Sequence, residues 1–141
     1  MIKQSECVHV FEMGCGEAKH LRKLNSMGIA TFGLDVSLPN VFKAQAQSEG
    51  IALGDEKYLR HLCNFDAVIC VSVLDHIPQV HAIVDELKRI ANKVIYLIET
   101  NDVVDNFYYQ HDYEGMDFAK LDEWLSDGDG ALYNLYVWYK N

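Results

Sequence analysis

Short apolar runs alternate with segments of helical periodicity along the first hundred residues. The apolar runs, which are typical of strands, cover residues 8–13, 29–36, 51–53, 65–74 and 93–99. The segments that place apolar residues on one helical face cover residues 18–27, 40–49 and 80–92. The run FDAVICVSVL at 65–74 is continuous, as in a strand that is buried on both faces. The alternation predicts right-handed βαβ crossovers, and hence a parallel sheet with helices on both faces.

The last part of the chain has a different pattern. Residues 118–125 and 131–140 are two further strand-like segments, separated by the turn-rich sequence SDGDG at 126–130. This arrangement predicts an antiparallel hairpin at the edge of the sheet. No repeat, low-complexity segment or linker interrupts the sequence, so residues 1–141 are expected to form one doubly wound α/β domain with a mostly parallel sheet.

Charge is distributed unevenly along the chain. Residues 94–141 contribute −8 of the net charge of −9, with two Lys or Arg against ten Asp or Glu, and they contain 11 of the 16 aromatic residues. Phosphate contacts need clustered Lys and Arg, so nucleic acid is disfavoured as a partner. No apolar run approaches the roughly 18 residues of a membrane span, and no secretory signal precedes the first strand. We therefore expect a cytoplasmic protein without a membrane partner.

Cysteine and histidine spacing gives no sign of a metal site. The four cysteines are Cys7, Cys15, Cys63 and Cys70. They contain no CxxC pair, and three of them lie in or beside apolar runs. They are predicted to be buried free thiols rather than disulfides or metal ligands. His111, Asp112 and Glu114 are close together in the sequence but lack regular ligand spacing. A solvated loop is the preferred interpretation there, and no metal is expected.

The sequence VFEMGCGEAKHL at 10–21 breaks from a strand-like run into a glycine loop and then a helical pattern, as nucleotide-binding loops do. The dinucleotide fingerprint needs a third glycine where Lys19 stands, and the carboxylates of Glu12 and Glu17 would repel a pyrophosphate. A nicotinamide-dependent reductase is therefore the weaker alternative. S-adenosylmethionine suits the loop better, because it carries an ammonium and a sulfonium, and a carboxylate that a helix N-terminus could receive.

Acidic residues end the next two strands. Asp35 follows Glu12 by 23 residues, near the spacing of an acid that accepts hydrogen bonds from ribose hydroxyls, and Asp55 stands where a carboxylate could accept from an adenine amino group. With these residues the sequence resembles the class I (seven-stranded, Rossmann-like) S-adenosylmethionine-dependent methyltransferases of the small-molecule type. The segments that carry the resemblance, in order, are VFEMGCG, GLDVS, LGD, FDAVICVSVLDHIP and the tail DYEGMDFAKLDEWL…ALYNLYVWYK.

The resemblance implies a cofactor site. Glu12 would lie near the methionine amino group, Asp35 with its neighbour Val36 at the ribose, and Asp55 with Glu56 at the adenine. The remaining implied residues are the loop Gly14, Cys15 and Gly16, which would let the backbone approach the cofactor, and Ser72 and Val73, near the transferred methyl. Two departures from the family are visible: Ala18 replaces a third glycine, and the early first strand implies that the usual N-terminal cap helices are missing.

Methyl transfer from a sulfonium is a direct displacement, so positioning dominates and a general base is optional. Among catalytic candidates His76 with Asp75 is the best pair, because the family often places an acid and a histidine there, although a histidine at a strand–helix junction more often has a packing or capping role. Tyr108, His111 and Asp112 are weaker candidates. The acidic, aromatic tail suggests recognition of an amine substrate, but packing of the last hairpin against the sheet is the favoured interpretation.

The sequence thus predicts S-adenosylmethionine-dependent methyl transfer to a small-molecule acceptor. The alternative is a non-catalytic S-adenosylmethionine-binding subunit or sensor that works with a partner chain. Because the cap is expected to be missing, a second copy of this chain or another protein is a candidate to cover the open site.

Overall fold

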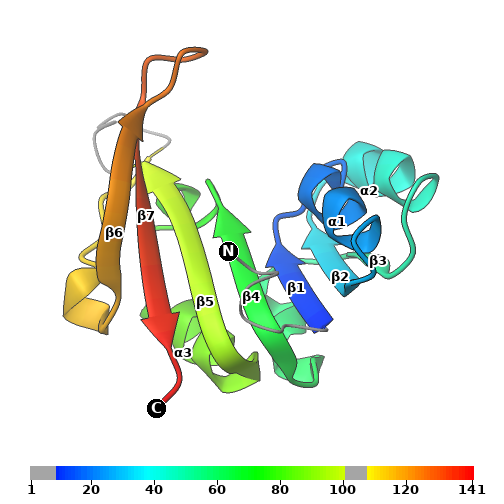
Figure 1. Cartoon of the computed structure of the whole chain (residues 1–141), viewed down its shortest axis with the longest axis horizontal. Coiled ribbons are helices and arrows are strands. Elements are labelled where there is room, and N and C mark those ends of the chain that lie inside the picture. Colours follow the sequence, from blue (N-terminus) through cyan, green and yellow to red (C-terminus); the bar gives the residue numbers. More distant parts are fainter. Residues whose placement is uncertain (1–8, 101–107) are drawn as a thin grey trace.

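The computed structural model describes residues 9–100 and 108–141, which form a single seven-stranded sheet in the order β3-β2-β1-β4-β5-β7-β6 (Figure 1). The strands are β1 (His9–Met13), β2 (Ala30–Asp35), β3 (Ile51–Leu53), β4 (Phe65–Val71), β5 (Ala91–Thr100), β6 (Ala119–Leu125) and β7 (Leu132–Tyr139). The first five strands are parallel to one another, whereas β7 runs antiparallel to both β5 and β6. The predicted doubly wound fold and its reversed C-terminal hairpin are therefore confirmed.

Helices cover both faces of the sheet. They are α1 (Lys19–Asn25), α2 (Leu38–Gln45) and α3 (His81–Ile90), with 3-10 turns η2 (Glu56–His61), η3 (Leu74–His76) and η4 (Glu114–Met116). Figure 1 shows α1 and α2 beside β1 to β3, with α3 on the opposite face behind β4 and β5. The family's short last helix, which the tail resembles, is only the single 3-10 turn η4 within the described residues.

Two apolar cores form because the strands present buried side chains to both faces. Leu21 and Leu24 of α1 pack into one core, and Leu87 and Ile90 of α3 pack into the other. Leu87 and Ile90 are completely buried, and each contributes about 1.5–3 kcal/mol relative to an exposed position. Five of the seven residues of β4 are buried, as the continuous apolar run predicted.

Several boundaries differ from the sequence prediction for local reasons. Helix α2 starts two residues early, because the Ser37 hydroxyl accepts the Asn40 N–H as an N-cap and Pro39 suits the first turn. Strand β4 ends at Val71 instead of residue 74, because Ser72 takes a left-handed conformation with φ 49° and η3 follows. In the hairpin β7, rather than β6, pairs with β5.

The thiol prediction is partly wrong. Cys15 and Cys70 are free and buried, but Cys63 is exposed because it follows η2 in the connection to β4. Cys7 and the first residue of the predicted strand at 8–13 lie outside the described residues, and the expectation about N-terminal cap helices is not tested by them. Across the described parts of the chain, no helix is long and apolar enough to cross a membrane.

Candidate active site

A cavity of 420 Å³ opens at the carboxyl ends of β1 to β4, around the place where the strand order reverses between β1 and β4. Open α/β sheets bind their ligands at this position. The residues that line the cavity are Met13, Gly14, Leu34, Asp35, Val36, Gly54, Asp55, Glu56, Ser72, Val73, His76 and Ile77. Seven of the ten predicted cofactor residues are among them, together with His76.

The glycine loop is pressed against the turn that follows β4. Gly14 has φ +70°, and a Cβ atom built on it would lie 2.2 Å from Cγ2 of Val73. Any side chain at this position would force the loop and the turn apart. Ala18, which replaces the third glycine, adopts φ 62°, so the turn keeps its shape despite the substitution.

Asp35 is a fixed carboxylate at the cavity wall. Its Oδ2 accepts the N–H of Gly16 and its Oδ1 accepts the N–H of Ser37, both at 2.8 Å. The side chain is nearly buried, so it is held in one orientation, and each oxygen retains a lone pair for a further donor. Val36 beside it is 71% exposed and forms an apolar rim. Gly16 therefore acts through its N–H rather than by lining the cavity.

Glu12 lies beneath the loop rather than on the cavity surface. Its Oε1 is 2.7 Å from Nδ1 of His20, whereas its Oε2 is buried without a hydrogen-bond partner among the described residues. Burial raises the pKa of Glu12, and the hydrogen bond from His20 opposes that shift. The same hydrogen bond raises the pKa of His20. The sequence analysis did not identify His20, although an i, i+8 spacing across a tight loop can bring two such side chains together.

The thiol of Cys15 points into the core. A Cβ on Gly33 of β2 would lie 2.8 Å from the Cys15 Sγ, and burial raises the pKa of the thiol to about 12. Cys15 can therefore contact a ligand only through its backbone.

Asp55 and Glu56 line the cavity after β3. Asp55 accepts the N–H of Lys57 and caps η2, a turn that sequence periodicity did not predict, and Glu56 is the first residue of that turn.

The predicted catalytic pair lies at η3, where the two residues have different environments. Asp75 is completely buried: its Oδ2 accepts the Thr100 hydroxyl at 3.0 Å, and its Oδ1 is 3.7 Å from Nε2 of His76. That separation is too long for a hydrogen bond. His76 is partly exposed, lines the cavity and packs against the Tyr108 ring at 4.7 Å between centroids.

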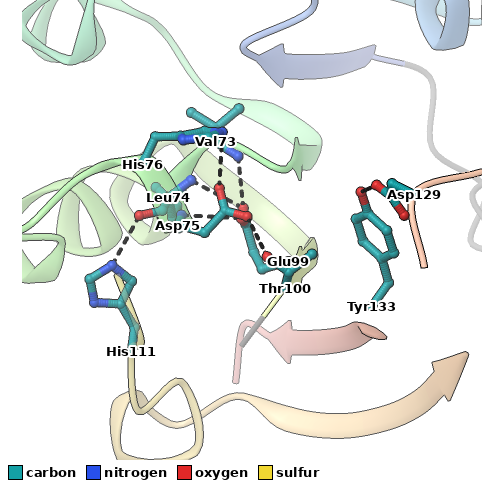
Figure 2. A network of polar contacts seen from close by, with 9 residues as sticks. All are labelled: Val73, Leu74, Asp75, His76, Glu99, Thr100, His111, Asp129 and Tyr133. Atoms are coloured by element: carbon teal, nitrogen blue, oxygen red, sulfur yellow. Dashed lines mark hydrogen bonds and ion pairs between the residues drawn. The ribbon is translucent and has the colours of Figure 1, made fainter. Parts of the chain in front are cut away.

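Contacts from later in the chain hold this turn (Figure 2). Glu99 at the end of β5 accepts the N–H groups of Val73, Leu74 and Asp75. His111 places Nε2 3.0 Å from the Leu74 carbonyl oxygen. The sequence analysis did not identify Glu99, although it ends an apolar run as Asp35 does, because a side chain that holds a turn through backbone N–H groups produces no spacing signal.

The other candidate side chains have local partners. Asp112 accepts the Gly115 N–H, and no group of three His, Cys, Asp or Glu side chains in residues 9–100 and 108–141 could hold a metal ion. In the hairpin, Leu135 and Tyr136 of β7 are buried, in keeping with the packing interpretation, whereas all of β6, including Trp124, is exposed. The Tyr133 hydroxyl donates to Asp129 at 2.9 Å (Figure 2).

The sequence of residues 11–97 matches the family described as a methyltransferase domain. The chain belongs to this family. The match includes the glycine loop, the acidic ends of β2 and β3, and the turn after β4, so every residue that lines the cavity lies within the matched methyltransferase domain. No curated protein matches the sequence.

Solved structures with a similar fold include a methyltransferase and a domain with bound SAH. Magnesium protoporphyrin IX methyltransferase from Synechocystis PCC 6803, with bound SAH, superposes with a TM-score of 0.80 at 18% identity, covering 99% of this chain and 77% of that one. The N-terminal domain of EvdMO1 with SAH bound gives 0.76 at 16% identity, covering 99% and 78%. TehB from Haemophilus influenzae gives 0.76 at 14% identity, covering 99% and 60%. These similarities confirm the predicted class I methyltransferase fold.

Proposed function

We propose that this methyltransferase domain binds S-adenosylmethionine in the 420 Å³ cavity and directs methyl transfer to a small-molecule acceptor. One observation carries the proposal. The residues predicted from the sequence to bind S-adenosylmethionine come from four separate strand ends, and they surround one cavity where the strand order reverses. Bound SAM or SAH in similar folds supports the choice of cofactor.

The donor set fits S-adenosylmethionine. The Asp35 carboxylate, held by two backbone N–H groups, is available to the two ribose hydroxyls. Asp55 and Glu56 border the space for the adenine, with Val36 as an apolar contact. Glu12 does not line the cavity, but its carboxylate lies beneath the glycine loop and suits the positive amino group by its charge. The closeness of Gly14 to Val73 leaves the loop backbone open to the cofactor.

S-adenosylmethionine supplies an electrophilic methyl group on its sulfonium when it is bound. Ser72, Val73 and His76 then form the wall on which the acceptor is aligned, and alignment is the main contribution of the protein to such a displacement. For an acceptor that loses a proton, Nδ1 of His76 receives it. Nε2 of His76 faces Oδ1 of Asp75, whose charge stabilises the resulting imidazolium.

The cavity surface favours an acceptor without phosphate groups. Its charged residues are carboxylates, Asp35, Asp55 and Glu56, and no Lys or Arg of the described residues lines it. Carboxylates repel an anionic ligand but tolerate a neutral or cationic one. Small phenols and amines are therefore the first acceptors to test.

Calorimetric titration of the full chain with S-adenosylmethionine, S-adenosylhomocysteine and NADH tests the cofactor assignment. We expect the first two to bind and NADH to give no heat of binding, since a pyrophosphate would meet the carboxylates of the loop. Binding of NADH alone, or of none of the three, would refute the proposal. Turnover with the panel of phenols and amines, followed by mass spectrometry of the products, then tests transfer.

A specific observation favours the alternative of a binding subunit with a partner chain. Val36 on the cavity rim and Leu38 and Phe42 on the outer face of α2 are 71, 49 and 64% exposed. Such a group of large apolar side chains beside a binding site is typical of a surface that another chain covers. Cofactor binding without turnover by the isolated chain, and turnover once a copurifying partner is added, would support this alternative.

A further inference from the structure

The turn between β4 and α3 depends on contacts from outside itself. Residues 72–77 contain only the 3-10 turn η3, yet they supply four cavity-lining residues: Ser72, Val73, His76 and Ile77. Ser72 has φ 49°, a left-handed conformation that is unfavourable for a residue other than glycine. Its neighbours must therefore impose this conformation.

Glu99 provides the largest set of these contacts. Its side chain is completely buried; Oε1 accepts the N–H groups of Val73 at 3.3 Å and Leu74 at 3.2 Å, and Oε2 accepts that of Asp75 at 3.3 Å (Figure 2). The N–H groups at the start of a helical turn have no partner within the turn. One carboxyl group from β5 therefore satisfies three of them.

The turn packs against the glycine loop, so the position of the turn affects that of the loop. Val73, which Glu99 holds through its N–H, fills the space that a Cβ on Gly14 would occupy, at 2.2 Å from its Cγ2. His76 follows on the same turn and donates its N–H to the Val73 carbonyl. A movement of the Glu99 contacts would shift the glycine loop and His76 together.

A second buried carboxyl group lies beside Glu99. Asp75 is also completely buried, and its Oδ1 has no hydrogen-bond partner among the described residues. Burial, and then the charge of Asp75, raise the pKa of Glu99 to about 8. The other titratable groups that face the pair come from β4, the turn, the segment after residue 107 and β7: Cys70, His76, His111, Tyr113 and Tyr136.

We propose that Glu99 is a positioning residue for the cofactor site: with Asp75 it forms a buried carboxyl pair that holds one proton, and this protonated pair keeps Val73 and His76 in place against the glycine loop. The inference rests on the function proposed above, because it concerns the same cavity. Loss of the proton puts a second negative charge beside Asp75, and the repulsion between the two carboxylates displaces the turn. Cofactor affinity should therefore fall on the alkaline side.

The test uses Glu99→Gln, because an amide has the size of a carboxyl group but cannot ionise. The affinity of the full chain for S-adenosylhomocysteine is measured by calorimetry between pH 6.5 and pH 9. At pH 6.5 we expect the variant to bind within about tenfold of the wild type, since its amide oxygen still accepts the N–H groups of Val73 and Leu74, whereas its NH2 group cannot accept that of Asp75. At pH 9 the wild type should have lost about tenfold relative to the variant, because binding that needs the protonated form falls about tenfold per pH unit above the pKa.

Controls separate Glu99 from other titrations. The amino group of the ligand, Glu12 and His20 ionise in both proteins, so only the difference between them reports Glu99. Glu49→Gln makes the same chemical change at an exposed position and should follow the wild-type profile. Calorimetry at pH 8 in buffers of different ionisation enthalpy should show more proton uptake on binding by the wild type than by Glu99→Gln. Identical profiles for wild type and variant would overturn the proposal.

A direct measurement covers the case in which the variant does not fold. The 13C chemical shift of the Glu99 carboxyl carbon, followed by NMR in the wild type, should report a protonated group at pH 7, and an ionised one would overturn the proposal. The outcomes are distinct from failure of the proposed function. If the wild type binds no S-adenosylhomocysteine at any pH, the cofactor assignment fails; if it binds with Glu99 ionised throughout, only the role of Glu99 fails.

Discussion

Glu12 occupies an unusual environment for an acidic residue, since it is almost completely buried and only one of its carboxylate oxygens has a partner within the described residues. That partner, His20, comes from the first turn of α1. A buried carboxylate with an unsatisfied oxygen is costly, unless a ligand supplies the missing donor. The Glu12 carboxylate therefore suits a cationic group, and the hydrogen bond with His20 offsets the cost of burying it.

His20→Ala should lower the free energy of unfolding by roughly 1–3 kcal/mol, because it leaves the buried Glu12 without a donor. The hydrogen bond raises the pKa of His20, so its stabilising effect is lost as the pH rises through that raised value. The effect also declines at acid pH, where Glu12, whose pKa is raised, takes up a proton. Urea denaturation of the variant and the wild type at several pH values measures this. Lys19→Ala, on the exposed neighbour, is the control; an equal loss in both variants would contradict the prediction.

Asp35→Ala should weaken S-adenosylmethionine binding by at least about tenfold, since hydrogen bonds to a charged group contribute roughly 1.5–3 kcal/mol each. The variant also releases the N–H groups of Gly16 and Ser37, so a modest loss of stability accompanies the loss of affinity. Calorimetry gives the affinity and thermal unfolding gives the stability. Undiminished affinity in a folded variant would remove Asp35 from the ribose site.

At the scale of the elements, the contact between the glycine loop and the turn after β4 is the tightest approach in the site. Gly14→Ala combines an unfavourable φ of +70° with a Cβ 2.2 Å from Val73 Cγ2. We expect it to destabilise the chain by roughly 1–3 kcal/mol and to abolish cofactor binding. Chemical denaturation and calorimetry measure the two effects.

Two further variants separate the backbone strain at positive φ from the steric collision between the new Cβ atom and Val73. Gly28→Ala has φ +78° but nothing within 4 Å of its Cβ, so it carries the backbone strain alone and should leave binding intact. Adding Val73→Ala to Gly14→Ala removes the atom that collides and should recover part of the lost stability. If the double variant is no more stable than Gly14→Ala, the collision is not the cause.

At the scale of the whole molecule, the buried carboxyl pair links global stability to pH. The pKa of Glu99 is raised from its ordinary value of 4.5 to about 8 in the fold, so the fold favours the protonated form. Its favourable contribution is complete below the pKa of the unfolded chain and is lost as the pH rises through about 8. Denaturation at pH 6.5 and pH 9 should show the wild type losing more stability than Glu99→Gln. Equal losses would contradict the linkage.

Much of this molecule follows from local pattern. Strands and helices appear in the predicted order because apolar periodicity records which faces are buried, and the acids that end β2 and β3 fall on the cavity because parallel strands share one carboxyl edge. Boundaries were less predictable. Ser37 moves the start of α2, and the left-handed Ser72 ends β4 early, since each depends on a particular hydrogen bond or turn.

The sequence by itself determined the fold class, the glycine loop and the strand-end residues of the candidate site, because these depend on short-range pattern and on which end of a strand a residue occupies. Only the tertiary structure decided how those residues are held. Glu12 meets His20, Val73 fills the space beside Gly14, and Glu99 holds the turn that carries His76. These pairings join segments up to tens of residues apart, and the packing of strands and loops brings them together.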